Sequence, residues 1–250
     1  MNIIRTFGYF IKICKIINYL ILYGLFDKFL RKSIVLSFRN FLSKKSNIER
    51  IEIEKVTNWK NKKIILQNLS LAGGNASRLE ILIIASLVSS LNENENVLEI
   101  GTFDGKTTIN CANNIKNSRV YTLDLPENEN GKMLDRKEEY LEYDKSLINS
   151  KIRSNKKFEK FNNIEQIYAD STIYDFSKIN FSLAFIDGGH DYNTVKSDTE
   201  NCMKHIKKPG IILWHDYDVT NPVGIYLRSI SKDIKIYWID NTRMCISYIN

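Results

Sequence analysis

Two pairs of polar residues with acid, base and metal-binding chemistry follow two neighbouring apolar runs of the chain. Asp187-Gly-Gly-His190 ends the first run, and His215-Asp216 ends the second. If both runs are parallel strands of one sheet, their carboxyl ends lie side by side and bring two carboxylates and two imidazoles close together. Carboxylates so placed can hold a hard divalent cation such as Mg²⁺, and His190 can take a hydroxyl proton as a general base.

A metal bound at Asp187 and Asp216 would lower the pKa of a coordinated hydroxyl group and fix its direction. We expect these two residues to be ligands and His215 to be a third. Because imidazole prefers borderline metals, a His215 ligand would favour Mn²⁺, Fe²⁺ or Zn²⁺ over Mg²⁺. In the alternative interpretation Asp187 caps a turn, and His190 either acts without a metal or only closes a hydrogen-bonded loop.

A glycine loop follows an earlier apolar run that contains one acid, Glu99. A phosphate-binding P-loop needs four residues between its first glycine and Gly-Lys-Ser/Thr, whereas only three separate Gly101 from the Gly-Lys-Thr that starts at Gly105. Phe103 occupies the second glycine position of a dinucleotide fingerprint, where its ring would block the phosphates. What remains is a Glu-x-Gly-x-x-x-Gly turn, and an acid beside such a turn indicates a charged ligand.

Two further acids come directly after predicted strands. Asp124 lies about twenty residues after the glycine loop, where an acid can accept hydrogen bonds from both ribose hydroxyls of an adenosyl group. Asp170, followed by Ser171, ends the next apolar run. Ligands of open α/β sheets bind beyond the carboxyl ends of the strands, so both acids face the expected binding edge. A turn-capping role is the alternative for each.

The elements that must position these residues alternate from residue 64 onward, which predicts an α/β fold with a Rossmann-like, doubly wound and mostly parallel sheet. Ser77 and Glu80 have the spacing of a capping box. Residues 126–163 form a long polar connection, which we interpret as a lid or substrate-facing helix. Predicted helices span residues 79–91, 106–114, 195–206 and 223–231. Predicted strands span residues 97–100, 120–123, 164–168, 183–186 and 210–213, and 234–239 with 244–249 form an antiparallel C-terminal pair.

In order and spacing, residues 97–108, 120–126, 167–171, 183–192 and 209–216 resemble the class I S-adenosylmethionine (SAM) dependent methyltransferases. The resemblance covers roughly residues 75–250 and implies SAM as cofactor. Glu99 and Gly101 would face the methionine half of SAM, and Asp170 would meet the adenine amino group. The cofactor-binding residues that the resemblance implies are Glu99, Gly101, Thr102, Phe103, Gly105, Asp124, Asp170, Ser171 and Asp187.

The spacing of Asp187 and His190, with an acid after the next strand, resembles more narrowly the metal-dependent sugar and small-molecule O-methyltransferases. These are the macrolide sugar methyltransferases and the cephalosporin-hydroxylase-like group. The resemblance implies a metal at Asp187 and Asp216, His190 as the catalytic base, and a hydroxyl acceptor on a sugar or glycan. His215 departs from the pattern, since an acid is common at its position. The alternatives are a catechol- or phenol-type small-molecule O-methyltransferase and a non-catalytic SAM-fold subunit bound to a partner or membrane.

The segment before residue 64 differs from the rest, so we divide the chain into an amphipathic helical extension, residues 1–63, and a methyltransferase domain, residues 64–250. The longest uncharged run, residues 16–26, is too short to span a bilayer. We expect one or two amphipathic helices in the extension. They either dock on the catalytic domain or on a second subunit of a homo-oligomer, or lie peripherally in a membrane interface with Lys and Arg toward the headgroups.

Composition narrows the partners and the compartment. The net charge of +7 is modest, and basic residues do not interleave with aromatic ones along one element, so we expect no nucleic-acid partner. The four cysteines are scattered without a Cys-x-x-Cys pair. We therefore expect neither a zinc site nor a disulfide framework, and a reducing cytoplasm as the location.

Overall fold

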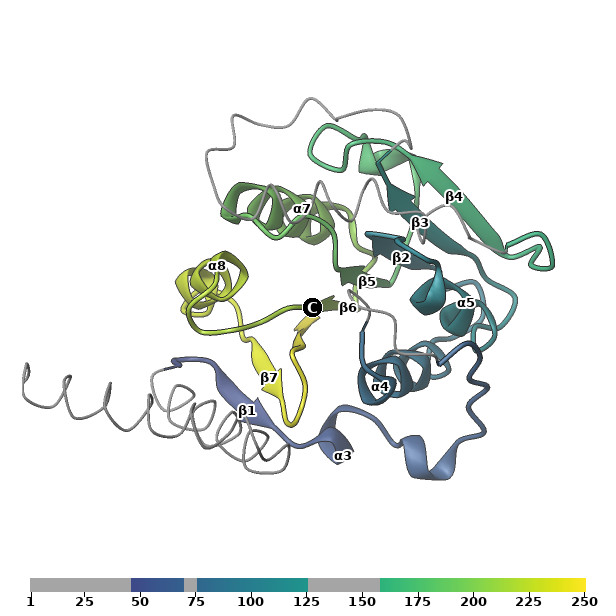
Figure 1. Ribbon diagram of the computed structural model, residues 1–250, viewed down its shortest axis with the longest axis horizontal. Coiled ribbons are helices and arrows are strands. Elements are labelled where there is room, and N and C mark those ends of the chain that lie inside the picture. Colours follow the sequence, from purple (N-terminus) through teal and green to yellow (C-terminus); the bar gives the residue numbers. More distant parts are fainter. Residues whose placement is uncertain (1–45, 70–75, 126–157) are drawn as a thin grey trace, which may run out of the picture. The chain divides into compact units, whose positions relative to one another are not determined.

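An eight-stranded sheet forms the centre of the structure, a computed structural model that describes residues 46–69, 76–125 and 158–250. The strand order is β1-β7-β8-β6-β5-β2-β3-β4 (Figure 1). Within this sheet β8 runs antiparallel to β6 and β7, and the other pairs are parallel. The strands are β1 (Glu49–Ile51), β2 (Val97–Ile100), β3 (Val120–Asp124), β4 (Ile164–Tyr168), β5 (Leu183–Ile186), β6 (Gly210–Trp214), β7 (Tyr237–Ile239) and β8 (Cys245–Ile249).

Helices cover both faces of the sheet. On one face α4 packs beside α5, and on the other α7 packs beside α8 (Figure 1). The predicted doubly wound, mostly parallel α/β fold with an antiparallel C-terminal strand pair is confirmed. The described helices are α3 (Ile53–Val56), α4 (Arg78–Val88), α5 (Lys106–Ala112), α7 (Tyr192–His205) and α8 (Pro222–Ile230), with short 3-10 helices at Trp59–Asn61 and Phe176–Lys178.

The central strands are fully buried because each is a short apolar run with a neighbour on both sides. All four residues of β2 and all four of β5 are buried. Ile83, Ile84 and Leu87 of α4 pack into the same core as these strands. Burial of one such side chain stabilises the fold by about 1.5–3 kcal/mol. The packed core therefore holds the strands, and with them the loops that follow their ends, in fixed positions.

Side-chain caps begin helices α4, α7 and α8. The predicted capping box is present at α4, where Ser77 Oγ accepts from the Glu80 backbone N–H and Glu80 accepts from the Ser77 N–H. At α7, the Asp191 side chain accepts from two backbone N–H groups of the first turn. At α8, Asn221 caps a helix that begins with Pro222. These caps fix the loops between strands and helices.

Several boundaries differ from the sequence prediction. Helix α7 begins at Tyr192, three residues earlier than predicted, because Asp191 supplies its cap. Helix α4 ends at Val88, and β7 begins only at Tyr237. Strand β1, which the periodicity did not predict, lies in the segment that we assigned to the extension and pairs in parallel with β7. Two of the three residues of β1 are exposed and the third is half-buried. The segment therefore has no apolar pattern from which a strand could be predicted.

Two predicted segments, the helical extension up to residue 45 and residues 126–157 of the long connection, lie outside the described residues. No helix within the described ranges is long and apolar enough to cross a membrane. Three of the cysteines fall within those ranges, and each is buried with a free thiol: Cys111, Cys202 and Cys245. Burial raises the pKa of all three thiols, which makes them poor nucleophiles.

Candidate active site

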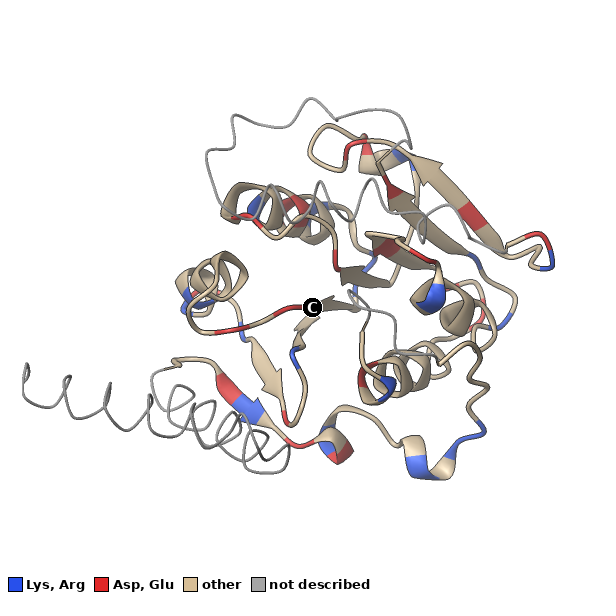
Figure 2. Cartoon of the chain, viewed as in Figure 1, with Lys and Arg blue, Asp and Glu red and all other residues tan. Residues whose placement is uncertain are grey.

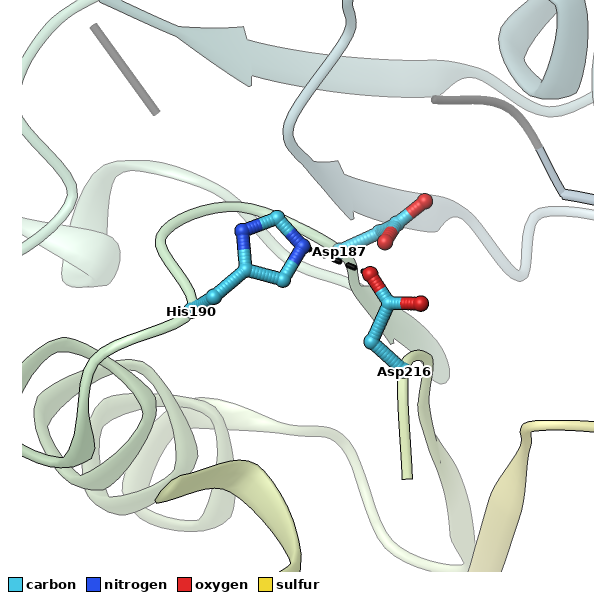
Figure 3. Close-up of side chains that lie close together, drawn as sticks. All are labelled: Asp187, His190 and Asp216. Atoms are coloured by element: carbon cyan, nitrogen blue, oxygen red, sulfur yellow. Dashed lines mark hydrogen bonds and ion pairs between the residues drawn. The ribbon is translucent and has the colours of Figure 1, made fainter. Parts of the chain in front are cut away.

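Asp187, His190 and Asp216 converge at the carboxyl ends of β5 and β6 (Figure 3). The two strands pair in parallel with Ile186 opposite Trp214, so the residues that follow them are neighbours. His190 Nε2 lies 2.6 Å from Asp216 Oδ2. One ligand atom from each of the three residues lies within 4.8 Å of the other two. The structure thus brings these predicted site residues together.

The backbone around this cluster is held by local hydrogen bonds. Asp216 has a φ of +56°, a left-handed conformation that aspartate tolerates better than most residues. The Asn221 side chain donates to the Asp216 carbonyl oxygen at 2.7 Å, which ties the loop to the start of α8. Asp191 holds the other loop against the start of α7. Asp216 and His190 are therefore presented by fixed loops.

His215, the predicted third metal ligand, is buried with both ring nitrogens facing carboxylates. Its Nδ1 lies 3.0 Å from Asp187 Oδ1 and 3.3 Å from Asp216 Oδ1. Its Nε2 lies 3.3 Å from Glu80 Oε2. Burial alone would lower the pKa of His215, but the Asp187 charge, with contacts to Asp187, Asp216 and Glu80, raises it well above its ordinary value. The ring is thus an internal cation between three acids.

Glu80 and Arg243 reach this cluster although sequence reasoning did not place them there. Glu80 is buried at the start of α4, and its Oε1 accepts a hydrogen bond from the Arg243 backbone N–H at 2.6 Å. Burial would raise the pKa of Glu80, yet His215 and the two backbone N–H groups lower it to about 2. The Arg243 side chain places Nη2 2.8 Å from Asp216 Oδ1. The only sequence signal for Glu80 was its capping box.

The two site aspartates differ in their electrostatics. Burial raises the pKa of Asp187, and the His215 charge only partly opposes this. For Asp216, the hydrogen bond with His190 and the nearby charge of His215 outweigh burial and hold its pKa well below the ordinary range. Asp216 is therefore the stable carboxylate that can orient His190 and balance a positive charge on its ring.

Glu99 of β2, just before the glycine loop, is buried. It accepts hydrogen bonds from the hydroxyl groups of Thr108 on α5 and Thr122 on β3. Burial raises its pKa to about 8, with Asp187 and Asp124 adding to the shift and the two threonine hydrogen bonds opposing it. In this arrangement Glu99 joins β2, β3 and α5 at the base of the loop.

The glycine loop touches the Asp187 loop directly. Gly101 has a φ of +95°, and a Cβ atom built there would lie 2.1 Å from the Asp187 carbonyl oxygen. Gly105 has a φ of +76°, and its Cβ would lie 2.5 Å from the Phe158 ring. Between them Phe103 also has a left-handed φ of +48°, and the Thr102 hydroxyl lies 2.7 Å from that of Thr122. Close approach of backbones therefore requires glycine at position 101.

Asp124 and Asp170 lie at neighbouring strand ends, since β3 pairs with β4 and the Ala169 N–H donates to the Asp124 carbonyl oxygen. Asp124 Oδ1 accepts from the Leu125 N–H at 3.0 Å. Asp170 Oδ1 accepts from the backbone and hydroxyl of Thr172, as a turn aspartate would. Its Oδ2 is buried without a hydrogen-bond partner among the described residues, and Ser171 beside it is buried. A buried carboxylate oxygen without a partner is uncommon in folded proteins.

Lys and Arg residues of the described chain are spread over β1, α3, α4, α5, α7 and α8 and their connections, with Asp and Glu between them (Figure 2). The ends of the central strands instead carry acids, including Asp124 and Asp187. A small hollow beside β5 and β6 is lined by Asp187, His190 and Asp216 together with apolar side chains such as Val195 and Val223. The site therefore presents carboxylates and an imidazole in a partly apolar setting.

Residues 98–217 match the family model described as a methyltransferase domain. This segment, just under half of the chain, is similar to methyltransferase domains. The match begins in β2 and ends at Tyr217, so it includes the glycine loop and the Asp187, His190 and Asp216 cluster. No sequence among the curated proteins matches the chain.

Several solved structures are similar to this chain at low sequence identity. The O-methyltransferase NovP shares 13% identity with a TM-score of 0.55, over 87% of this chain and 99% of NovP. Precorrin-6y C5,15-methyltransferase from Geobacter metallireducens shares 12% identity with a TM-score of 0.49, over 75% of this chain and 94% of that protein. CalS11, a TDP-rhamnose 3′-O-methyltransferase, shares 13% identity with a TM-score of 0.44, over 68% of this chain and 77% of CalS11. The likeness to NovP shows that the two chains share a Rossmann-like fold.

Proposed function

We propose that this chain transfers a methyl group from SAM to a hydroxyl oxygen on a sugar or glycan. The observation that carries the proposal is the His190–Asp216 hydrogen bond of 2.6 Å, placed beside Asp187 where the methyltransferase sheet binds its ligands. An imidazole held by a carboxylate is an effective general base. NovP, which shares the fold, is itself an O-methyltransferase, and this is consistent with an oxygen acceptor.

The proposed reaction uses His190 to remove one proton. Because Nε2 faces Asp216, we assign the Nε2–H tautomer, in which Nε2 donates to the carboxylate and Nδ1 is the ring's acceptor. As Nδ1 takes the hydroxyl proton, the acceptor oxygen forms a bond to the SAM methyl carbon in line with the breaking S–C bond. The electron pair of that bond stays on sulfur, which gives S-adenosylhomocysteine, and Asp216 stabilises the imidazolium.

SAM would be held by the loops at the carboxyl ends of β2, β3 and β4. The turn from Gly101 to Gly105 follows β2 and would contact the methionine half, and Asp124 at the end of β3 would accept hydrogen bonds from the ribose hydroxyls. The buried, unpartnered Oδ2 of Asp170 supports a contact to adenine. The contact between Gly101 and Asp187 links this cofactor region to the catalytic loop.

A divalent cation fits the donor set of the cluster. Asp187, His190 and Asp216 offer two carboxylates and one imidazole at a mutual distance that one ion can span. Asp187 and Asp216 would hold the ion, which would lower the pKa of the acceptor hydroxyl when bound. For His215 to bind it as predicted, its Nδ1 would have to give up the 3.0 Å contact with Asp187 Oδ1.

Methyl transfer from labelled SAM to a panel of sugars, glycans and phenols tests the proposal. We expect His190→Ala to lower kcat by about 10²- to 10⁴-fold, with the Kd for SAM little changed. His205→Ala is the matched control, because His205 lies at the end of α7 and stacks on Phe176. Wild-type turnover by the His190 variant would contradict the assignment of the base. Transfer to phenols but not to sugars would replace the proposed acceptor class.

A further inference from the structure

Glu80 makes more contacts than its place in a helix cap requires. A capping-box glutamate uses its carboxylate on the N-cap N–H, which Glu80 does through Oε2 at 2.7 Å from the Ser77 nitrogen. The same carboxylate also accepts from the Arg243 N–H at 2.6 Å and lies 3.3 Å from His215 Nε2. These two partners come from the β7–β8 turn and from the end of β6. One side chain therefore joins three separate parts of the chain.

The burial of Glu80 gives these contacts their weight. Its exposed fraction is 3%, whereas a carboxylate that only capped a helix would gain from staying in water. Burying a charge costs free energy unless hydrogen bonds and opposite charges offset the loss of water. The contacts with Ser77, Arg243 and His215 provide that offset. Two of these three groups, Arg243 and His215, also contact the aspartates of the active site.

Two partners of Glu80, His215 and Arg243, also contact the catalytic cluster. The His215 ring, held at Nε2, places Nδ1 3.0 Å from Asp187 Oδ1 and 3.3 Å from Asp216 Oδ1. Arg243, whose backbone Glu80 holds, places Nη2 2.8 Å from Asp216 Oδ1. The other oxygen of Asp216 faces His190. Two connected paths thus lead from Glu80 to the carboxylate that orients the proposed base.

We propose that Glu80 is a positioning residue of the active site, which fixes the His215 ring and the Arg243 backbone so that Asp187 and Asp216 are held where His190 needs them. The expected effect on turnover rests on the proposed function. The positioning of the side chains by Glu80 does not depend on that function. Groups that orient catalytic or metal-binding residues in this way contribute about 10- to 100-fold to activity.

Steady-state kinetics of Glu80→Gln test the effect on turnover. Gln keeps the size of Glu80 but replaces one carboxylate oxygen with an amide N–H₂ donor. With a single acceptor oxygen, it cannot serve the N–H groups of Ser77, Arg243 and His215 together. We expect kcat to fall by about 10- to 100-fold, with KM for SAM within about twofold of wild type. If Glu80→Gln does not fold, Glu80→Asp, which retracts the carboxylate by one methylene, is measured with the same expected direction.

Two control variants separate positioning from stability. Ser77→Ala removes the Oγ acceptor of the capping box and leaves the Glu80 carboxylate in place. Leu87→Ala removes a buried contact from the core side of the same helix. We expect both to unfold more readily than wild type and to keep a kcat near that of wild type. A loss of kcat in either control equal to that in Glu80→Gln would overturn the proposal.

Imidazole nitrogen spectra give a readout that does not depend on activity. The chain has three histidines, so ¹⁵N-edited spectra of the rings resolve into His190, His205 and His215. We expect Glu80→Gln to shift the ring signals of His215 and His190 while those of His205 stay unchanged. Unchanged His215 and His190 signals would overturn the proposal. Shifted signals in a protein without methyltransferase activity would support the positioning role and remove the proposed function instead.

Discussion

Gly101→Ala is the substitution for which the structure gives the most definite consequence. Its Cβ would lie 2.1 Å from the Asp187 carbonyl oxygen and 2.9 Å from the Gly188 Cα, both backbone atoms that cannot turn aside. The φ of +95° adds backbone strain for any residue other than glycine. We take about 1–3 kcal/mol for the strained conformation and about 1–3 kcal/mol for the displaced backbone. The expected loss of unfolding free energy is about 2–6 kcal/mol.

Gly188→Ala is the matched control, because it changes a glycine of the loop that Gly101 contacts. The nearest atom to its Cβ is Ile100 Cγ2 at 3.1 Å, a side-chain atom that can move by a few tenths of an ångström. We expect a loss of about 1 kcal/mol or less there. Urea unfolding of both variants measures the difference, and titration of SAM into each shows whether the displaced Asp187 loop weakens cofactor binding. Equal stability of the two variants would refute the close approach of the loops.

Two further predictions concern pH. Because burial raises the pKa of Glu99 to about 8, the folded chain keeps a proton that the unfolded chain releases above about pH 4.5. Stability should therefore fall as the pH rises between these values, and urea unfolding of Glu99→Gln should lack this slope; an identical slope in both proteins would contradict it. Glu80 has the opposite sign, since its pKa is lowered to about 2. The Glu80 carboxylate should stabilise the fold by about 3 kcal/mol above pH 4.5 and lose this contribution as the pH falls through about 2. The unfolding free energies of wild type and Glu80→Gln should therefore converge near pH 2. A difference between them that stays constant with pH would count against the ion pair with His215.

Much of the fold could be predicted because the central strands carry a strong local signal. β2 and β5 are short apolar runs, and parallel strands buried on both faces need that composition. Once the strands were placed in one sheet, the proximity of Asp187, His190 and Asp216 followed from the rule that strand ends share an edge. The pairing β5 with β6 puts these residues where the rule expects them.

The unpredicted parts depend on contacts between segments far apart in the chain. β1 has two exposed residues and one half-buried residue, and pairing with β7 makes it a strand. Glu80 has the local pattern of a helix cap, and nothing near it in the sequence indicates that His215 lies 3.3 Å away. Arg243 lies in a turn, where a charged residue is unremarkable. Which side chains contact and support a site depends on tertiary packing. Sequence periodicity gives no information on such contacts between distant segments.

The central claim is that the chain binds SAM and uses it, and isothermal titration of SAM into the purified, chelator-treated protein tests this most directly. We expect binding with a Kd on the order of micromolar, lost in Asp124→Ala. Addition of Mg²⁺ or Mn²⁺ should give a separate binding heat that Asp187→Ala abolishes. A folded sample that takes up no SAM, with or without metal, would contradict the claim and the proposed methyl transfer with it.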